Sequence, residues 1–499
     1  MALILSGYFQ DVKNLIKQPP GLPSMNPTVA AWQEPAHPTV SNAQSPALPE
    51  AVDVVIIGSG ITGCSVAHTL LHHLSAAKLR VTMLEARTAV SGATGRNGGH
   101  LVSDSDSLFS VLVSSIGFER AVETVRFSEA NIRRIKDLVA QLSPADQDAV
   151  EFRTVNSVSG FGDKESFRDA VETINQLTKA VPDGDVKYKV TPKGEIEEFK
   201  FGNVVGVTEQ RGVAALWPYR LMTAILSGLK KDYHERFTLE TNTPVLSIDY
   251  ESVPSSAHAY TLHTPRGKIR AKQIVHCTNG YSARLIPNLT GKLYPLKGTM
   301  SAQKMGPSFP LLGDRISWSH VAKGSYDAET GLLKVGLYYA QQNAKTGVMF
   351  LGGEAQKLGG LLTSDDSFVA ADARESLCSA ASHIWEDAAP VEPLKVWSGI
   401  MGFTADGMPL VGNVPESLTG RPGSGEWISA GFNGHGMDKC WLSGEAVARM
   451  VLGETDIPQF PRAYLLDAER IGAFSLDMAA ETLMDHIVSG GSDVPKSHL

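Results

Sequence analysis

Residues 53–85 constrain the fold of this chain more than any other segment. A β-branched run at 54–57 leads into the turn Gly58–Gly63, with the sequence Gly-Ser-Gly-Ile-Thr-Gly, and apolar residues at helical spacing then precede a second apolar run at 81–84. The first glycine of such a turn permits a tight bend, the second lets the backbone approach a pyrophosphate, and the third lets the helix pack on the sheet. The segment therefore predicts a strand, a turn, a helix and a strand that bind a dinucleotide at the helix N-terminus.

Glu85 ends the second of these strands, about 20 residues after Gly63, as the dinucleotide motif requires. A carboxylate at this position accepts hydrogen bonds from ribose hydroxyls and repels a 2′-phosphate, so the segment disfavours NADP. The motif by itself does not distinguish FAD from NAD.

The composition excludes several classes of protein. The 499 residues include 53 acidic and 45 basic side chains, so the net charge of −8 leaves no basic surplus for a nucleic acid. The four cysteines lie far apart without a CxxC pair, and neither HExxH nor GxSxG occurs, so we expect no disulfide framework, no metal site and no Ser-His-Asp triad. No run of about 18–20 apolar residues is present, so we expect no membrane span. The length predicts two or three structural units.

Both ends of the chain carry further predictions. Residues 1–49 form a proline-rich arm, in which we expect the prolines to prevent a long helix or a central strand. Tyr8 and Trp32 favour an arm docked on the folded body over a disordered tail, because aromatic rings are costly to leave in water. The chain ends in Ser497-His498-Leu499, which is similar to the peroxisomal address Ser-Lys-Leu. We therefore expect a peroxisomal protein that binds the import receptor, with the cytoplasm as the alternative.

Hydrophobic periodicity predicts the other elements. We expect helices at about 61–78, 118–142, 164–181, 217–231, 367–387 and 441–452, and strands at 237–249, 259–264 and 272–277. The stretch 185–202 is strand-like or irregular.

Five segments together resemble one family, the FAD-dependent D-amino-acid oxidase superfamily, and most closely its glycine oxidase, sarcosine oxidase and γ-glutamylputrescine oxidase-like branch. The resemblance covers roughly residues 50–460. It rests on the Gly58–Glu85 unit, the loop Ser91–His100, the segments Gly212–Leu221 and Ile269–Ala283, and the pair Trp397–Gly412 and Gly431–Gly436. Independently of the resemblance, the residue types of the glycine-rich loop Ser91–His100 offer free backbone N–H groups to a pyrophosphate and leave space for a planar ring.

The resemblance implies an α/β fold in which a discontinuous, Rossmann-like FAD-binding domain is joined to an α+β substrate domain with a large mixed or antiparallel sheet. The FAD-binding domain is expected at 50–105, 205–290 and 395–470, and the substrate domain at 106–204 and 291–394. Residues 471–499 are expected to be a C-terminal tail.

The resemblance also implies the cofactor and its ligands. The residues expected to bind FAD are Gly58, Gly60, Ile61, Thr62, Gly63, Glu85, Ala86, Arg87, Thr94, Gly95, Arg96, Asn97, Gly98, Gly99, His100, Val245, Thr278, Asn279, Gly280, Gly434, His435, Gly436 and Met437. Sarcosine oxidase-like members bond the flavin through a cysteine before the Thr-x-Asp motif, but residues 396–403 contain none, so we expect non-covalent FAD. His100 is the one nearby side chain that would allow a covalent link.

The reaction implied by the resemblance is hydride transfer from a C–H next to nitrogen to the flavin, which then reduces O₂ to H₂O₂. No dedicated general base is required. The candidate catalytic residues are His435, Lys297 and Asp438. For His435 the alternative is a histidine that only supports its loop by hydrogen bonds, and for Lys297 the alternative is a structural role.

Asp438 is a departure from the family. Sarcosine oxidase-like members have a lysine two residues after Gly-His-Gly, where it holds the substrate carboxylate, whereas here Asp438 stands at that position and Lys439 follows. An acid repels a carboxylate and attracts a cation, so we expect an amine or polyamine-like substrate. The alternative is that Asp438 points away and Lys439 takes the role. Two other functions stay open: a flavin dehydrogenase or tailoring enzyme with another electron acceptor, and a non-catalytic FAD-binding protein.

Overall fold

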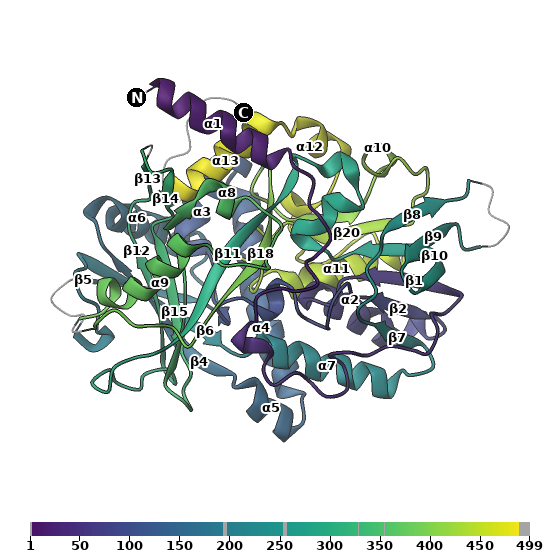
Figure 1. Cartoon of the computed structure of the whole chain (residues 1–499), viewed down its shortest axis with the longest axis horizontal. Coiled ribbons are helices and arrows are strands. Elements are labelled where there is room, and N and C mark those ends of the chain that lie inside the picture. The colour runs from purple at the N-terminus through teal and green to yellow at the C-terminus, as the bar shows by residue number, and fades with distance from the viewer. Residues whose placement is uncertain are drawn as a thin grey trace.

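The computed structural model describes residues 2–192, 197–252, 257–327, 329–353, 355–386 and 388–488. Two large β-sheets lie next to each other and are covered by helices (Figure 1). The chain passes between the sheets several times, so each sheet contains strands from distant parts of the sequence. The predicted α/β fold, a Rossmann-like part joined to a sheet-rich part, is confirmed.

The first sheet contains the predicted dinucleotide-binding strands. Strand β1 (Ala51–Ile57) pairs in parallel with β2 (Val81–Leu84) on one side and with β10 (Gly267–His276) on the other. The last four residues of β1 are all buried, as expected for a parallel strand that is covered on both faces. The other strands of this sheet are β7 (Phe237–Glu240), β8 (Ser247–Tyr250), β9 (Tyr260–Thr264), β19 (Leu410–Asn413) and β20 (Glu426–Ala430).

Helix α2 (Ile61–His72) follows the glycine turn and packs between α11 (Cys440–Val451) and α7 (Pro218–Asp232). The close approach of α2 and α11 depends on Gly444, where a Cβ atom would lie 2.6 Å from Cβ of Ser65. These three helices agree with the predicted ones, except that α2 ends at His72, where the chain turns out of the helix.

The second sheet has the order β18-β11-β16-β15-β12-β4-β6-β3, with β5 paired to β6. Its strands are β3 (His100–Leu101), β4 (Arg153–Phe161), β5 (Lys187–Pro192), β6 (Gly206–Ala215), β11 (Leu293–Lys304), β12 (Ile316–Val321), β15 (Leu337–Gln342), β16 (Val348–Gly352) and β18 (Lys395–Thr404). A small third sheet contains β13 (Ser325–Asp327), β14 (Leu332–Lys334) and β17 (Ala355–Lys357).

The remaining helices surround the two sheets (Figure 1). They are α3 (Ser105–Ile116), α4 (Phe118–Ala140), α5 (Pro144–Val150), α6 (Lys164–Ala180), α8 (Leu358–Leu361), α9 (Ala371–Ile384), α10 (Glu416–Thr419), α12 (Ala468–Ala473) and α13 (Leu476–Val488). No helix in the described residues is long and apolar enough to cross a membrane.

Three strands lie in a different sheet from the one that the predicted domain ranges suggest. Strand β3 falls in the range 50–105, β6 in the range 205–290 and β18 in the range 395–470, yet all three belong to the second sheet. Strand β18 pairs antiparallel with β11 from Leu293 opposite Thr404 to Ala302 opposite Lys395. Sheet membership is set by such long-range pairing, which local periodicity does not reveal. The division of the chain into domains stays a prediction.

The N-terminal arm is docked, as predicted, but it is not free of helix. Helix α1 (Ala2–Ile16) contradicts the expectation that prolines prevent a long helix in residues 1–49, because the first proline is Pro19. Tyr8 and Trp32 are 4% and 2% exposed. Helix α1 packs along α13, in which Asp477 accepts a hydrogen bond from Lys13 at 2.7 Å (Figure 1).

The predicted strand at 237–249 is two strands, β7 and β8, separated by residues 241–246. Asn242 in this connection has a φ of 50°, which ends regular strand geometry. The far end of the predicted C-terminal tail, including Ser497–Leu499, lies outside the described residues.

Candidate active site

A large cavity lies between the two sheets. Its volume is about 1380 Å³, which exceeds the roughly 300–1,000 Å³ of a common ligand pocket. The first sheet contributes the C-terminal ends of β1, β2 and β10, and the second sheet contributes β11, β18, β4 and β12. The cavity therefore has space for a dinucleotide together with a second, smaller molecule.

The glycine turn forms one wall of the cavity. Gly58 has a φ of +108°, and a Cβ atom there would lie 2.5 Å from the carbonyl oxygen of Cys277. Gly63 does not line the cavity; a Cβ atom there would lie 2.0 Å from the carbonyl oxygen of Gly58, so this glycine closes the turn against the helix. Gly60, Ile61 and Thr62 do line it. The N-terminus of α2 thus meets the cavity as the dinucleotide motif predicts.

Glu85 lies at the end of β2 and lines the cavity with Ala86 and Arg87. Its carboxylate accepts hydrogen bonds from Ser59 N at 3.1 Å, from Ser59 Oγ at 2.6 Å and from Arg87 N at 3.0 Å. These bonds fix the carboxylate at the cavity edge, where two oxygens with several lone pairs retain capacity for ribose hydroxyls.

The loop Ser91–His100 supplies the next part of the wall through Thr94, Arg96, Asn97, Gly98, Gly99 and His100. Gly98 lies against the Tyr339 ring, and a Cβ atom there would approach the ring to 2.8 Å. Gly95 does not line the cavity; it packs against the carbonyl oxygen of Val90. Thr94 Oγ1 accepts a hydrogen bond from Ile61 N at 3.0 Å, which ties this loop to the start of α2.

The two arginines expected at the cofactor are held by a buried carboxylate that the sequence analysis missed. Arg87 Nη1 lies 2.8 Å from Asp366 Oδ2, and Arg96 Nε lies 3.7 Å from the same oxygen. Arg96 also donates to the carbonyl oxygens of Ser91 and Ser398. Burial lowers the pKa of Arg96 to about 10. These guanidinium groups therefore brace the wall of the cavity as well as line it.

Asn279 is joined by a hydrogen bond to the glycine-rich loop at residues 431–437, which also lines the cavity. Asn279 Oδ1 accepts a hydrogen bond from Gly431 N at 3.0 Å, and Thr278 and Val245 line the cavity nearby. Gly280 does not line it, because its Cα faces the backbone of β18, where a Cβ atom would lie 2.3 Å from the carbonyl oxygen of Met401.

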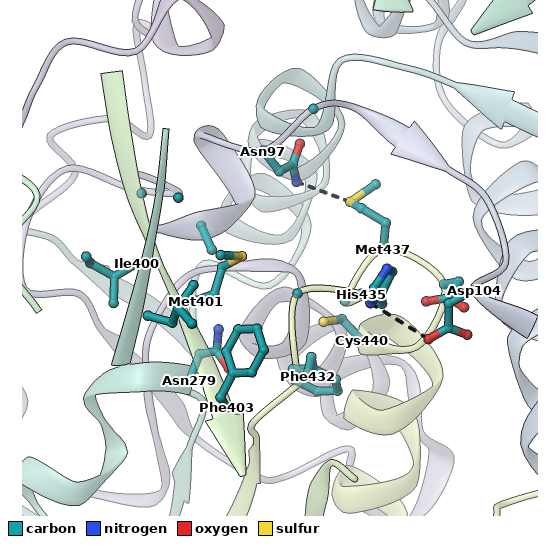
Figure 2. A pocket seen from close by; sticks show the side chains of 18 of the residues that line it. Asn97, Asp104, Asn279, Ile400, Met401, Phe403, Phe432, His435, Met437 and Cys440 are labelled. Carbon is teal, nitrogen blue, oxygen red and sulfur yellow. Dashed lines mark hydrogen bonds and ion pairs between the residues drawn. The ribbon is translucent and has the colours of Figure 1, made fainter. Parts of the chain in front are cut away.

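His435 and Met437 extend into the cavity from the loop at residues 431–437, beside Gly434 and Gly436 (Figure 2). Met437 faces the loop Ser91–His100 (Figure 2). Asn97 Nδ2 lies 3.3 Å from Met437 Sδ, and His435 Nδ1 lies 4.0 Å from Asp104 Oδ2. The structure thus brings together two loops that are more than 300 residues apart in the sequence.

Asp438 does not present a free negative charge to the cavity. It is 1% exposed, and Lys439 Nζ lies 2.9 Å from its Oδ1, while Ser128 Oγ donates to its Oδ2 at 2.6 Å. Lys439 Nζ also lies 2.6 Å from Asp104 Oδ2. Burial raises the pKa of Asp438, and Lys439 holds the pKa of Asp104 below its usual range. The lysine compensates both acids, so the substrate argument that was based on Asp438 loses its support.

Lys297 is fully buried and lines the cavity from β11, opposite Ile400 of β18. Its Nζ lies 3.4 Å from the centroid of the Phe368 ring. The aromatic ring stabilises the charge of an ammonium at this position. A role of Lys297 in oxygen or substrate handling, with a structural role as the alternative, stays a prediction.

His100 and two cysteines are the side chains on the cavity wall that bear on a covalent cofactor link. Burial lowers the pKa of His100 to about 4, and its Nε2 has no hydrogen-bond partner in the described part of the chain. Cys277 and Cys440 also line the cavity. The prediction of non-covalent FAD rested only on residues 396–403 and did not include these two cysteines. Burial raises the pKa of Cys440 to about 12 and that of Cys277 well above its usual range, so both remain thiols.

The far end of the cavity is formed by α3 and α6, and the sequence analysis did not identify it. Asp106, Ser110 and Ser114 line it at a spacing of four residues on α3, and Asp169, Glu172 and Thr173 line it on α6. This spacing, which places the polar side chains on one helix face, is the signal that the sequence contained. Burial raises the pKa of Asp106 to about 6, and the described residues place no basic nitrogen within 4.0 Å of it. Neither helix contributes a lysine or arginine to this wall.

The described residues contain no group of three or more side chains suited to a metal ion. The cavity combines a dinucleotide site with the polar end that α3 and α6 form. The family described as FAD dependent oxidoreductase matches residues 53–450 of the chain. The chain belongs to this family. It is an enzyme, an oxidoreductase, and its cofactor is FAD.

Solved structures share this fold. Glycine oxidase from Geobacillus kaustophilus is 20% identical, with a TM-score of 0.62 over 84% of this chain and 99% of its own. L-amino acid deaminase from Proteus vulgaris is 16% identical, with a TM-score of 0.62 over 85% of this chain and 99% of its own. L-proline dehydrogenase from P. horikoshii is 19% identical, with a TM-score of 0.58 over 83% and 96%. No curated protein matches the chain.

Proposed function

We propose that this enzyme oxidises the C–N bond of an amine to the imine and passes the electrons to O₂, giving H₂O₂. The observation that carries the amine is the acidic end of the cavity. Asp106 lies there without a cationic partner among the described residues, and the walls from α3 and α6 supply carboxylates and hydroxyls. A substrate ammonium group would compensate the charge of the half-buried Asp106.

An amino-acid substrate is less well suited to this acidic chamber, the end of the cavity that α3 and α6 form. Glycine oxidase and L-amino acid deaminase are named for amino acids, whose carboxylates are held best by arginine or lysine. Here Arg87 and Arg96 are paired with Asp366, and Lys439 is enclosed by Asp104 and Asp438. The acidic chamber therefore favours a di- or polyamine over a simple α-amino acid.

When bound, FAD supplies the hydride acceptor for the carbon next to nitrogen. The residues of the chain position the substrate and tune charge. His435 and Asp104 line the cavity with Nδ1 and Oδ2 4.0 Å apart, where they can orient an amine, and Lys297 lines it from β11. A Lys297 ammonium would stabilise the negative charge that develops on O₂ when it accepts electrons.

A panel of amines tests the substrate class. Anaerobic enzyme is mixed with putrescine, spermidine, cadaverine, glycine, sarcosine and D-alanine, and the bleaching of flavin absorbance is followed in a stopped-flow instrument. We expect bleaching by the di- and polyamines at concentrations at which the amino acids leave the flavin oxidised. Faster bleaching by sarcosine or a D-amino acid would contradict the proposal.

The electron acceptor is tested separately, because an L-proline dehydrogenase shares this fold and the alternative is a dehydrogenase. The enzyme reduced by its best amine is exposed to air, and peroxide is measured alongside flavin reoxidation. We expect one peroxide per flavin within seconds. Reoxidation that needs a quinone or dye, with no peroxide in air, would assign the enzyme to the dehydrogenases.

We propose that the FAD is bound non-covalently, since the two cavity thiols are held protonated. Acid precipitation should leave the yellow chromophore in the supernatant, and colour that stays with the pellet would contradict this. We also propose that Ser497-His498-Leu499 directs the protein to peroxisomes through the import receptor. Removal of these three residues should move a tagged protein to the cytoplasm, and an unchanged location would contradict this.

A further inference from the structure

The N-terminal arm makes direct contacts with the glycine-rich loop of the FAD site. Trp32 Nε1 donates a hydrogen bond to the carbonyl oxygen of Asn97 at 2.5 Å, and Gln33 Nε2 donates to that of Gly95 at 3.1 Å. Arg96 Nη1 donates to the carbonyl oxygen of Thr28 at 2.8 Å. Loop and arm are thus joined at three successive places.

None of the three arm residues in these contacts, Thr28, Trp32 and Gln33, lines the cavity. The indole of Trp32 lies under Gly99, where a Cβ atom would approach its ring to 3.2 Å, and it stacks on Phe350 with centroids 4.0 Å apart. These three residues therefore support the loop from outside the cavity, whereas Gly21, Leu22 and Pro23 of the same arm line it.

The loop is held only in part by bonds within it, such as those from Arg96 Nε to the carbonyl oxygen of Ser91 at 2.7 Å and from Gly99 N to Asn97 Oδ1 at 2.9 Å. Between residues 91 and 100 it contains four glycines, which carry no side chain and lose more conformational freedom on ordering than any other residue. Its carbonyl groups at Gly95 and Asn97 are satisfied by the arm, and a buried carbonyl without a partner is costly. The arm therefore adds an external support to the loop conformation that receives FAD.

Thr28 extends the same support to two other segments. Its Oγ1 accepts a hydrogen bond from Ser398 N of β18 at 2.9 Å, and its N donates to the carbonyl oxygen of Asp366 at 2.8 Å. Asp366 holds Arg87 and Arg96, so one arm residue joins the loop, a strand of the second sheet and the buried carboxylate.

We infer that the N-terminal arm is a brace for FAD binding, and that Trp32 and Thr28 are positioning residues which act on the cofactor through the loop Ser91–His100. Only a fraction of molecules would hold the loop in its binding form without the brace, and the apparent affinity for FAD falls by that fraction. The inference concerns the cofactor and does not depend on the identity of the substrate.

The test measures release of FAD from the holoenzyme after dilution, by the rise in flavin fluorescence. Trp32→Phe keeps the ring stacked on Phe350 but removes the indole N–H. Trp318→Phe is the matched control, since Trp318 is also fully buried and its Nε1 donates at 2.9 Å to the carbonyl oxygen of Phe199, a residue outside both the loop and the arm. Loss of one hydrogen bond should make release from Trp32→Phe about three- to tenfold faster than from wild type, with release from Trp318→Phe within about twofold.

Thr28→Val adds a second, independent variant that keeps shape and removes the hydroxyl. It should also release FAD faster, and the double variant Trp32→Phe/Thr28→Val should release it faster than either. Urea unfolding of all variants shows whether a substitution lowers the free energy of unfolding of the whole protein or weakens only the binding of FAD. Release as slow as in wild type, or acceleration equal in Trp32→Phe and Trp318→Phe, would overturn the inference and assign the arm a purely structural role.

Discussion

Lys439 shows how one residue decides the charge of the site. It lies between two buried carboxylates, with Nζ 2.6 Å from Asp104 and 2.9 Å from Asp438. Burial by itself would lower the pKa of a lysine, but the two acids raise it above its usual range. The ammonium therefore stays charged and keeps the acids from repelling each other.

Lys439→Met should destabilise the protein strongly, because it leaves two buried carboxylates without a cation. Breaking a buried ion pair in this way costs about 3–5 kcal/mol. Urea unfolding at pH 7 measures the loss. The control is Lys272→Ala, whose Nζ lies 2.7 Å from Asp53 but is 43% exposed, and which should cost less than about 1 kcal/mol. Equal losses in both variants would refute the account of the buried cluster.

Asp106→Asn should raise stability and weaken substrate binding. The pKa of Asp106 is raised to about 6, so the native state holds a proton that the unfolded state has released between about pH 4 and pH 6. The ionised carboxylate therefore destabilises the wild type above pH 6. The asparagine variant should be about 1–3 kcal/mol more stable at pH 7, with no gain below about pH 4.

The same variant should raise the KM for a diamine about tenfold or more at pH 8, because the counter-charge is lost. Asp137→Asn, an exposed position on α4, should change neither quantity. A stabilised Asp106→Asn enzyme with an unchanged KM would show that Asp106 does not meet the substrate.

At the scale of elements, the glycine turn and α2 form the part of the site that local sequence describes best. Gly63→Ala would place a Cβ atom 2.0 Å from the carbonyl oxygen of Gly58, so the turn must open. We expect loss of bound FAD, measured by the ratio of flavin to protein absorbance after purification. Gly228→Ala in α7, where no atom lies within 4 Å of the added carbon, should keep FAD and gain up to about 1 kcal/mol in unfolding free energy. Full FAD content in Gly63→Ala would contradict the role of this turn.

The elements themselves were predictable where periodicity was long and regular. Helices α4 and α6 agree with the predicted 118–142 and 164–181, because both carry a clear apolar face. Helix α1 was not predicted, because the prolines that disfavour a helix in the arm begin only at Pro19, after the helix ends. The sheets to which β6 and β18 belong could not be predicted, since strand pairing joins residues that are far apart in sequence.

At the scale of the whole molecule, FAD should stabilise the protein as a unit. The cavity walls come from both sheets, so a ligand that fills it binds only the folded chain. At 100 times its dissociation constant, FAD should add about 2.7 kcal/mol, which corresponds to a rise of about 2–3 °C in Tm for a chain of this length. Thermal melts of the apoprotein with increasing FAD measure this. FMN, which lacks the adenosine part, should give a smaller shift, and equal shifts would contradict the role of the glycine turn.

The sequence by itself determined the cofactor half of this protein. The turn Gly58–Gly63 and Glu85 specify a dinucleotide site because local backbone sterics and helix geometry act within about 30 residues. Only the tertiary structure decided the charge of the substrate half. It paired Lys439 with both Asp438 and Asp104, left Asp106 without a cation among the described residues, and placed the arm residue Trp32 under the FAD loop. The physical reason is that burial and charge depend on neighbours in space, and Asp104 and Lys439 are 335 residues apart in the chain.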